Sequence, residues 1–136
     1  MKKNEKGFTL IELLAVIVIL AVIALIATPI VMNVINKSRQ KAAEDSAYGV
    51  FEAIKAYHAE KMLDVNADVT DTLTVTFTDG TPSEANLKIG GTKPQSGKVS
   101  INEDGSIGID DNNPLIINGY SCTGSDATSV KCENNG

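Results

Sequence analysis

The feature that most constrains this chain is an apolar run near its N-terminus. The run covers residues 8–27, and residues 13–27 contain no polar side chain at all. A helix of this length spans about 30 Å, which is the thickness of the hydrocarbon core of a bilayer. The sequence therefore predicts a membrane-spanning helix at this position.

Lysines before the run predict its orientation. The first six residues, MKKNEK, contain three Lys and one Glu. Positive residues are retained on the cytoplasmic side of a span, so the N-terminus is expected inside the cell and everything after Met32 outside. A cleaved secretory signal fits less well, because the run exceeds the roughly 7 to 15 apolar residues of such signals and no A-x-A site follows it.

Glu12 is an unusual residue at this place in an apolar helix. A carboxylate at the centre of a bilayer costs up to about 3 kcal/mol, so such a residue is a functional candidate that needs a partner. The alternative is that Glu12 lies at the membrane interface and interacts favourably with the dipole of the helix N-terminus. Both interpretations remain open from the sequence.

The helix is expected to continue past the membrane as an amphipathic segment over residues 33–63. One helix from Phe8 to Met62 would be about 80 Å long. Pro29 lacks an N–H and its ring clashes with the preceding turn, which predicts either a simple kink or a soft segment over residues 21–30 that unwinds during assembly. Apolar residues recur at helical spacing in this region: Val31, Val34, Ile35, Ala42, Ala43, Ala47, Val50, Phe51, Ile54, Tyr57 and Met62.

Residues 64–136 contain short β-type runs between turn residues. The run 73–78 alternates strictly and ends at Asp79-Gly80, a turn pair. We expect an α+β fold in which a small antiparallel sheet of three to four strands packs on the outer half of the helix, over Ala47, Val50, Phe51 and Ile54. The candidate strands are residues 73–78, 87–89, 98–101, 106–109 and 115–117.

Cys122 and Cys132 are the only cysteines. Their segment is expected outside the membrane, where disulfides persist, and a bridge between them would contribute about 3 kcal/mol in the entropic account. Two free thiols are the alternative. The spacing and the number of cysteines exclude a C-x-x-C redox site and a cysteine-based zinc site.

Other chemistry finds little support in the sequence. The formal charge of −5 argues against direct binding of nucleic acid, which needs a basic surface. The single His58 is expected to be a surface or packing residue. We find no nucleophile motif, no phosphate loop and no cofactor motif, so no catalytic residue is assigned. The acidic stretch Asp104, Asp110, Asp111, Asn112 and Asn113 offers oxygen ligands of the kind that Ca²⁺ prefers, but it lacks a D-x-D-x-D-G loop and is interpreted as turns without a metal.

The leading lysines, the hexapeptide Gly7-Phe8-Thr9-Leu10-Ile11-Glu12 and the apolar run together resemble the class III signal of type IV pilins and pseudopilins. The resemblance covers residues 1 to about 35 and includes Pro29. It implies that a prepilin peptidase cuts between Gly7 and Phe8 and that the new amine of Phe8 is N-methylated. The expected parts are a leader over residues 1–7, a transmembrane and assembly helix over 8–32, the amphipathic helix over 33–63, and the sheet with a cysteine loop over 64–136.

The resemblance further implies a structural subunit of a filament that serves adhesion, motility or DNA uptake. Its partners would be copies of itself and related pilins, the peptidase and methyltransferase, a platform protein and an extension ATPase. It would lie in the lipid bilayer before assembly and at the cell surface afterwards. Glu12 of one subunit would pair with the Phe8 amine of another, which penalises wrong staggers. A type II secretion pseudopilin and a membrane-anchored surface binding module are the alternatives.

Overall fold

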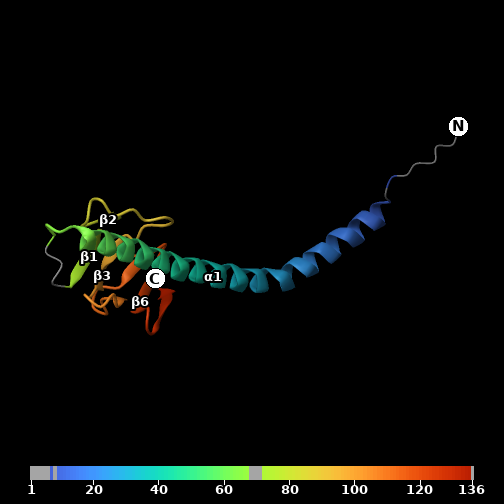
Figure 1. Cartoon of the computed structure of the whole chain (residues 1–136). Helices are drawn as coiled ribbons and strands as arrows, with labels where there is room; N and C mark the ends of the chain where they lie inside the picture. The colour runs from blue at the N-terminus through green and yellow to red at the C-terminus, as the bar shows by residue number, and fades with distance from the viewer. Residues whose placement is uncertain (1–6, 8, 68–71, 136) are drawn as a thin grey trace. The chain divides into compact units, whose positions relative to one another are not determined.

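The computed structural model describes residues 7, 9–67 and 72–135. Within these residues the chain forms one helix followed by strands (Figure 1). It divides into an N-terminal unit, Met1–Lys37, and a C-terminal unit, Ser38–Gly136. The elements are α1 (Leu10–Leu63), β1 (Leu73–Thr78), β2 (Thr81–Pro82), β3 (Ser96–Ile101), β4 (Ile107–Ile109), β5 (Leu115–Ile117), β6 (Tyr120–Ser125) and β7 (Ser129–Asn134).

The N-terminal unit contains the apolar part of α1. Among the described residues, this is the one helix long and apolar enough to cross a membrane. Its side chains are exposed, with Ala27 half-buried. The helix continues through Pro29, which leaves the carbonyl of Leu25 without its usual N–H donor. The Thr28 hydroxyl donates to the carbonyl oxygen of Ala24 at 2.6 Å, in the turn that Pro29 disturbs. A kink or soft segment at Pro29 remains a prediction.

The C-terminal unit has one hydrophobic core between α1 and the sheet. On the helix, buried residues recur three or four positions apart, and they include the predicted face of Ala47, Val50, Phe51 and Ile54. The strands contribute alternating residues, because successive side chains of a strand point to opposite faces. The predicted α+β architecture is confirmed. The largest fully buried strand residues are Val75, Phe77, Val99, Ile101, Ile107, Leu115 and Ile117.

The sheet is antiparallel, with the strand order β2-β1-β3-β4-β6-β5 and with β7 added to β6. Two of its hairpins turn on residue pairs with positive φ at both positions. These are Asp79-Gly80, at 50° and 80°, and Asn118-Gly119, at 52° and 83°. Such pairs match the twist of the flanking strands, and Gly takes the second position without steric cost. The predicted turn at Asp79-Gly80 is confirmed.

The sheet differs from the expectation in two respects. It has seven strands within the described residues, where three to four were expected, because β6 and β7 form a further hairpin in the segment interpreted as a cysteine loop and because the two-residue strand β2 pairs with the end of β1. Residues 87–89 are not a strand. The N–H of Leu87 donates to the carbonyl of Glu84, so this segment makes a turn and buries Leu87 from a loop.

The strand β7 is the edge of the sheet beside α1, and two helix side chains satisfy its outward backbone groups. The N–H of Val130 donates to the Tyr48 hydroxyl at 2.9 Å, and the Gln40 amide donates to the carbonyl of Cys132 at 2.6 Å. Lys55 and Asp126 add an ion pair at 3.4 Å. Covering an edge strand in this way hinders its pairing with another chain.

Candidate functional site

The predicted cleavage site joins Gly7 to Phe8. Gly7 is exposed, and a Cβ atom added to it would meet no described atom within 4 Å. Packing among the described residues therefore does not explain why this position is a glycine. Phe8 and the leader residues 1–6 lie outside the described residues, so cleavage and N-methylation remain predictions.

The N-terminus of α1 is capped by reciprocal hydrogen bonds between Thr9 and Glu12. The backbone N–H of Thr9 donates to Oε2 of Glu12 at 3.0 Å, and the N–H of Glu12 donates to Oγ1 of Thr9 at 3.2 Å. The N–H of Leu13 donates to the Thr9 carbonyl at 3.1 Å, the first helical bond. This arrangement is a capping box, which satisfies backbone donors that the first turn leaves unpaired.

The capping box places the Glu12 carboxylate at the positive end of the helix dipole. This position stabilises an acidic group and fits the interface interpretation of Glu12. Its use as a partner for an amine on another chain is not tested by a single chain. The sequence analysis included the dipole interaction but missed the capping hydrogen bonds, although Thr followed three residues later by Glu ahead of an apolar run is a known signature of a helix start.

Cys122 and Cys132 are joined by a disulfide, as one of the two alternatives predicted. They are directly opposite each other on β6 and β7, and neither is exposed to solvent. The bridge thus closes the last hairpin from inside the core. The alternative of two free thiols is not what the structure shows.

The acidic stretch forms turns. The hydroxyl and the N–H of Ser106 both donate to Oδ1 of Asp104, at 2.6 and 3.0 Å, and lower the pKa of that carboxyl. The N–H of Asn112 donates to Asp110 at 2.8 Å and, with the Asn113 amide, lowers the pKa of Asp110. These carboxylates serve local turns. Among the described residues no three His, Cys, Asp or Glu side chains gather to hold a metal ion.

His58 is buried on α1, with only 3% of its surface exposed, and it is a packing residue. Its Nε2 has no hydrogen-bond partner in the part of the chain that the structure describes.

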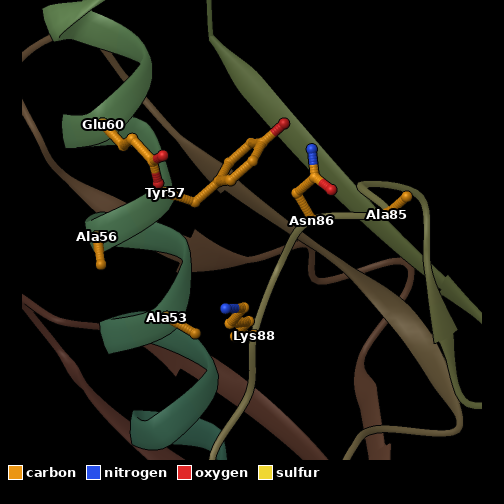
Figure 2. A pocket seen from close by; sticks show the side chains of 7 residues that line it. All are labelled: Ala53, Ala56, Tyr57, Glu60, Ala85, Asn86 and Lys88. Carbon is orange, nitrogen blue, oxygen red and sulfur yellow. The ribbon is translucent and has the colours of Figure 1, made fainter.

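A surface hollow of about 520 Å³ lies between the end of α1 and the loop after β2 (Figure 2). The Tyr57 hydroxyl at its margin donates to Glu84 at 2.6 Å. None of its lining residues is a Ser, Cys or His that could act as a nucleophile beside a base. Its lining residues are Ala53, Ala56, Tyr57, Glu60, Ala85, Asn86 and Lys88.

Comparisons with known proteins found one family model and one curated relative. The family model described as "Prokaryotic N-terminal methylation motif" matches residues 2–28. The fimbrial protein EcpC of Eikenella corrodens is 38% identical over 61 residues, which cover 45% of this chain and 40% of that protein. The chain thus matches less than half the length of this relative. No solved structure matches the chain. The resemblance to type IV pilins is confirmed by the first two findings.

Proposed function

We propose that this chain is a prepilin, a structural subunit that polymerises through its N-terminal helix into a type IV pilus-like filament. The observation that carries the proposal is the helix start. A capped turn with an acidic residue is followed directly by an apolar helix whose side chains contact little else in the chain. The methylation motif and the fimbrial relative support the same function.

Removal of the leader at Gly7-Phe8 is the step that we expect to make the helix competent for assembly. Before the cut, the three lysines hold the N-terminus at the cytoplasmic face. After the cut, the leader charge is gone and Phe8 carries a positive amine four residues before Glu12. The exposed apolar part of α1 then leaves lipid for the helices of neighbouring subunits, an exchange that gains little because lipid is equally apolar.

Glu12 is proposed to set the register of this polymer. One carboxylate oxygen accepts the Thr9 N–H, and an ionised carboxylate has further lone pairs that can accept from a donor on another chain. A stagger that brings the Phe8 amine of a neighbour to this oxygen neutralises both charges. A different stagger leaves two unpaired charges in apolar surroundings, which is costly.

The role of the filament is proposed more broadly, as adhesion, motility or DNA uptake. The printed name of the relative, a fimbrial protein, favours a pilus over a type II secretion pseudopilus. The proposed partners are further copies of the chain and related pilins, a prepilin peptidase and methyltransferase, a platform protein and an extension ATPase. The chain is proposed to lie in the membrane with a cytoplasmic N-terminus before assembly, and at the cell surface afterwards.

The experiment is mass spectrometry of the N-terminal peptide from filaments sheared off the producing cells. We expect the peptide to begin at Phe8 and to carry one added methyl group. An intact Met1, or a new N-terminus beyond Ala27, would contradict the proposal. A membrane-anchored or secreted binding module would then be the better description.

A further inference from the structure

We infer that two surfaces at opposite ends of the C-terminal unit bind each other between successive copies of this chain. The first is the tip patch, formed by Met62, Leu63 and Val65. The second is the base hollow, lined by Arg39, Ala42, Asn118 and Tyr120. The inference rests on the proposed function, because the two copies are neighbours in the filament.

The tip patch consists of apolar side chains that the described residues of its own unit leave exposed. Met62 is 55% exposed, Leu63 is 84% exposed and Val65 is 95% exposed. Among the described residues of the C-terminal unit, the other exposed large apolar side chain is Tyr48, whose hydroxyl accepts the Val130 N–H. Single exposed apolar residues are ordinary, but a cluster on an otherwise polar surface marks an interaction site.

The backbone holds the tip patch in a defined turn. The N–H of Asp64 donates to the carbonyl of Lys61, and the N–H of Ala67 donates to the carbonyl of Asp64, both at 3.1 Å. The N–H of Asn66 donates to the Asp64 carboxylate at 3.0 Å. The turn presents a carboxylate between two exposed apolar side chains, Leu63 and Val65. The nearby ammonium of Lys61 lies over the ring of Tyr57, 5.1 Å from its centre.

The base hollow complements the tip patch in shape and charge. Its volume is about 260 Å³. The small side chain of Ala42 leaves room beside the ring of Tyr120, so the hollow has apolar walls. Arg39 adds a positive charge, and Asn118 lies in the tight turn between β5 and β6. The hollow can therefore accept an aliphatic side chain together with a neighbouring carboxylate.

The positions of the two surfaces require a second copy. Ala42 and Leu63 are 21 positions apart on one helix, so about 32 Å separates them along its axis and a chain cannot fill its own hollow. A symmetric tip-to-tip dimer would bring two Asp64 carboxylates together and leave the hollow unused. Contact of the tip with the hollow is instead head-to-tail, and a repeated head-to-tail contact that does not close builds a filament.

The test is disulfide crosslinking in filaments sheared from cells that produce the full chain. Ala42→Cys combined with Val65→Cys should give a ladder of covalent oligomers after mild oxidation. Each single variant should give no ladder. A matched control combines Ala42→Cys with Thr74→Cys, an exposed position on β1, and it should also give none. The native cysteines do not interfere, because they are bonded to each other and buried.

A charge exchange tests the same contact without new cysteines. Asp64→Arg and Arg39→Glu should each lower the yield of sheared filaments about threefold to fivefold, the scale of one exposed ion pair repeated at each subunit. The double variant should restore the yield to within about twofold of the wild type. Cellular abundance of each variant, measured on membranes, shows that the chain still folds.

The outcomes separate this contact from the proposed function. Wild-type filaments with a Phe8 N-terminus, together with filaments of the Ala42→Cys and Val65→Cys double variant that give no ladder, would show that the filament exists and that the contact is wrong. Crosslinking that stops at dimers would also overturn the contact. So would a double variant of Asp64→Arg and Arg39→Glu whose filament yield does not recover. If wild-type cells yield no filaments, the proposed function is wrong, and the contact between filament neighbours is wrong with it.

Discussion

The two parts of α1 use the same backbone for opposite purposes. In the N-terminal unit the helix is almost entirely apolar and its side chains are exposed. In the C-terminal unit the helix is amphipathic and buries one face, including Val50, Phe51 and Ile54, against the sheet. This difference in exposure indicates what each part of the helix packs against. The second part is stabilised by its own chain, whereas the first is left exposed by the described residues and, in the proposed function, is covered by lipid or by other copies of the chain.

The largest effect on stability is expected when one apolar residue in each part of the helix is replaced by alanine. Phe51→Ala removes a core side chain that is 1% exposed and should lower the free energy of unfolding by about 3–5 kcal/mol. The matched variant Leu20→Ala, at a 59% exposed position, should leave it unchanged. Near-ultraviolet circular dichroism in detergent can measure this, because all three tyrosines lie in the C-terminal unit: Tyr48, Tyr57 and Tyr120.

If Phe51→Ala and Leu20→Ala lowered the free energy of unfolding equally, the proposed difference between the two parts would be wrong, since the apolar part of α1 would then also be stabilised by the C-terminal unit.

The disulfide is expected to have the next largest effect. Replacing both Cys122 and Cys132 by Ala should cost about 3 kcal/mol of stability, because the open hairpin gains freedom in the unfolded chain. Thermal unfolding with and without reductant checks this. Reductant should lower the melting temperature of the wild type and should leave that of the double variant unchanged. A melting temperature of the wild type that does not change with reductant would contradict this prediction, since the sequence has no other cysteine.

In the N-terminal unit, charge and capping at Glu12 can be separated. Glu12→Gln keeps an acceptor for the Thr9 N–H but removes the charge, and we expect filament yield to fall about 30-fold, or about 2 kcal/mol, as for an uncompensated charge near a membrane interface. Thr9→Ala removes the reciprocal acceptor but keeps the charge, and it should reduce yield only about fivefold, for a loss near 1 kcal/mol.

Immunoblots of sheared and cell-bound fractions measure both variants, with the mass of the mature chain as the control for processing. If Thr9→Ala reduced the yield more than Glu12→Gln, the role of Glu12 would be to cap its own helix and not to pair with a neighbour.

A smaller effect is expected at the sheet edge that the helix covers. Tyr48→Phe removes the acceptor of the Val130 N–H and should cost about 1 kcal/mol. Hydrogen exchange should accelerate at Val130. The neighbouring Lys131, which lies opposite Thr123 in the β6–β7 ladder, serves as the control and should exchange as in the wild type. Equal acceleration at both amides would indicate that the whole hairpin has detached.

Local sequence patterns predicted the parts of the fold whose determinants are local. The helix, the turn at Asp79-Gly80 and the hairpin of β3 and β4 follow from spacing and turn residues alone. The Thr9 to Glu12 cap was equally local, and its signature was present but not used. Residues 87–89 were misassigned because a short apolar run in a loop that covers the core looks the same as a short strand.

The missed hairpin of β6 and β7 has one determinant within the hairpin itself, the disulfide, and one far away in the sequence, Gln40. Its inward positions are Cys122, Val130 and Cys132, too few large apolar residues to mark two strands. What fixes it are the disulfide and the hydrogen bond from Gln40 to Cys132, which joins residues 92 positions apart.

The smallest effect is expected for the dependence of the melting temperature on pH, which tests the carboxylate in the turn at Asp110. The N–H of Asn112, with help from the Asn113 amide, lowers the pKa of Asp110. A lowered pKa contributes stability that is present above the pKa of the unfolded chain, about 4, and that is lost as the pH falls through the pKa of the folded chain. Asp110→Asn keeps an acceptor but cannot titrate. The difference in melting temperature between wild type and variant should therefore be largest at neutral pH and should vanish in acid, while a constant difference from pH 7 to strongly acidic pH would show that the charge of Asp110 plays no part in the turn.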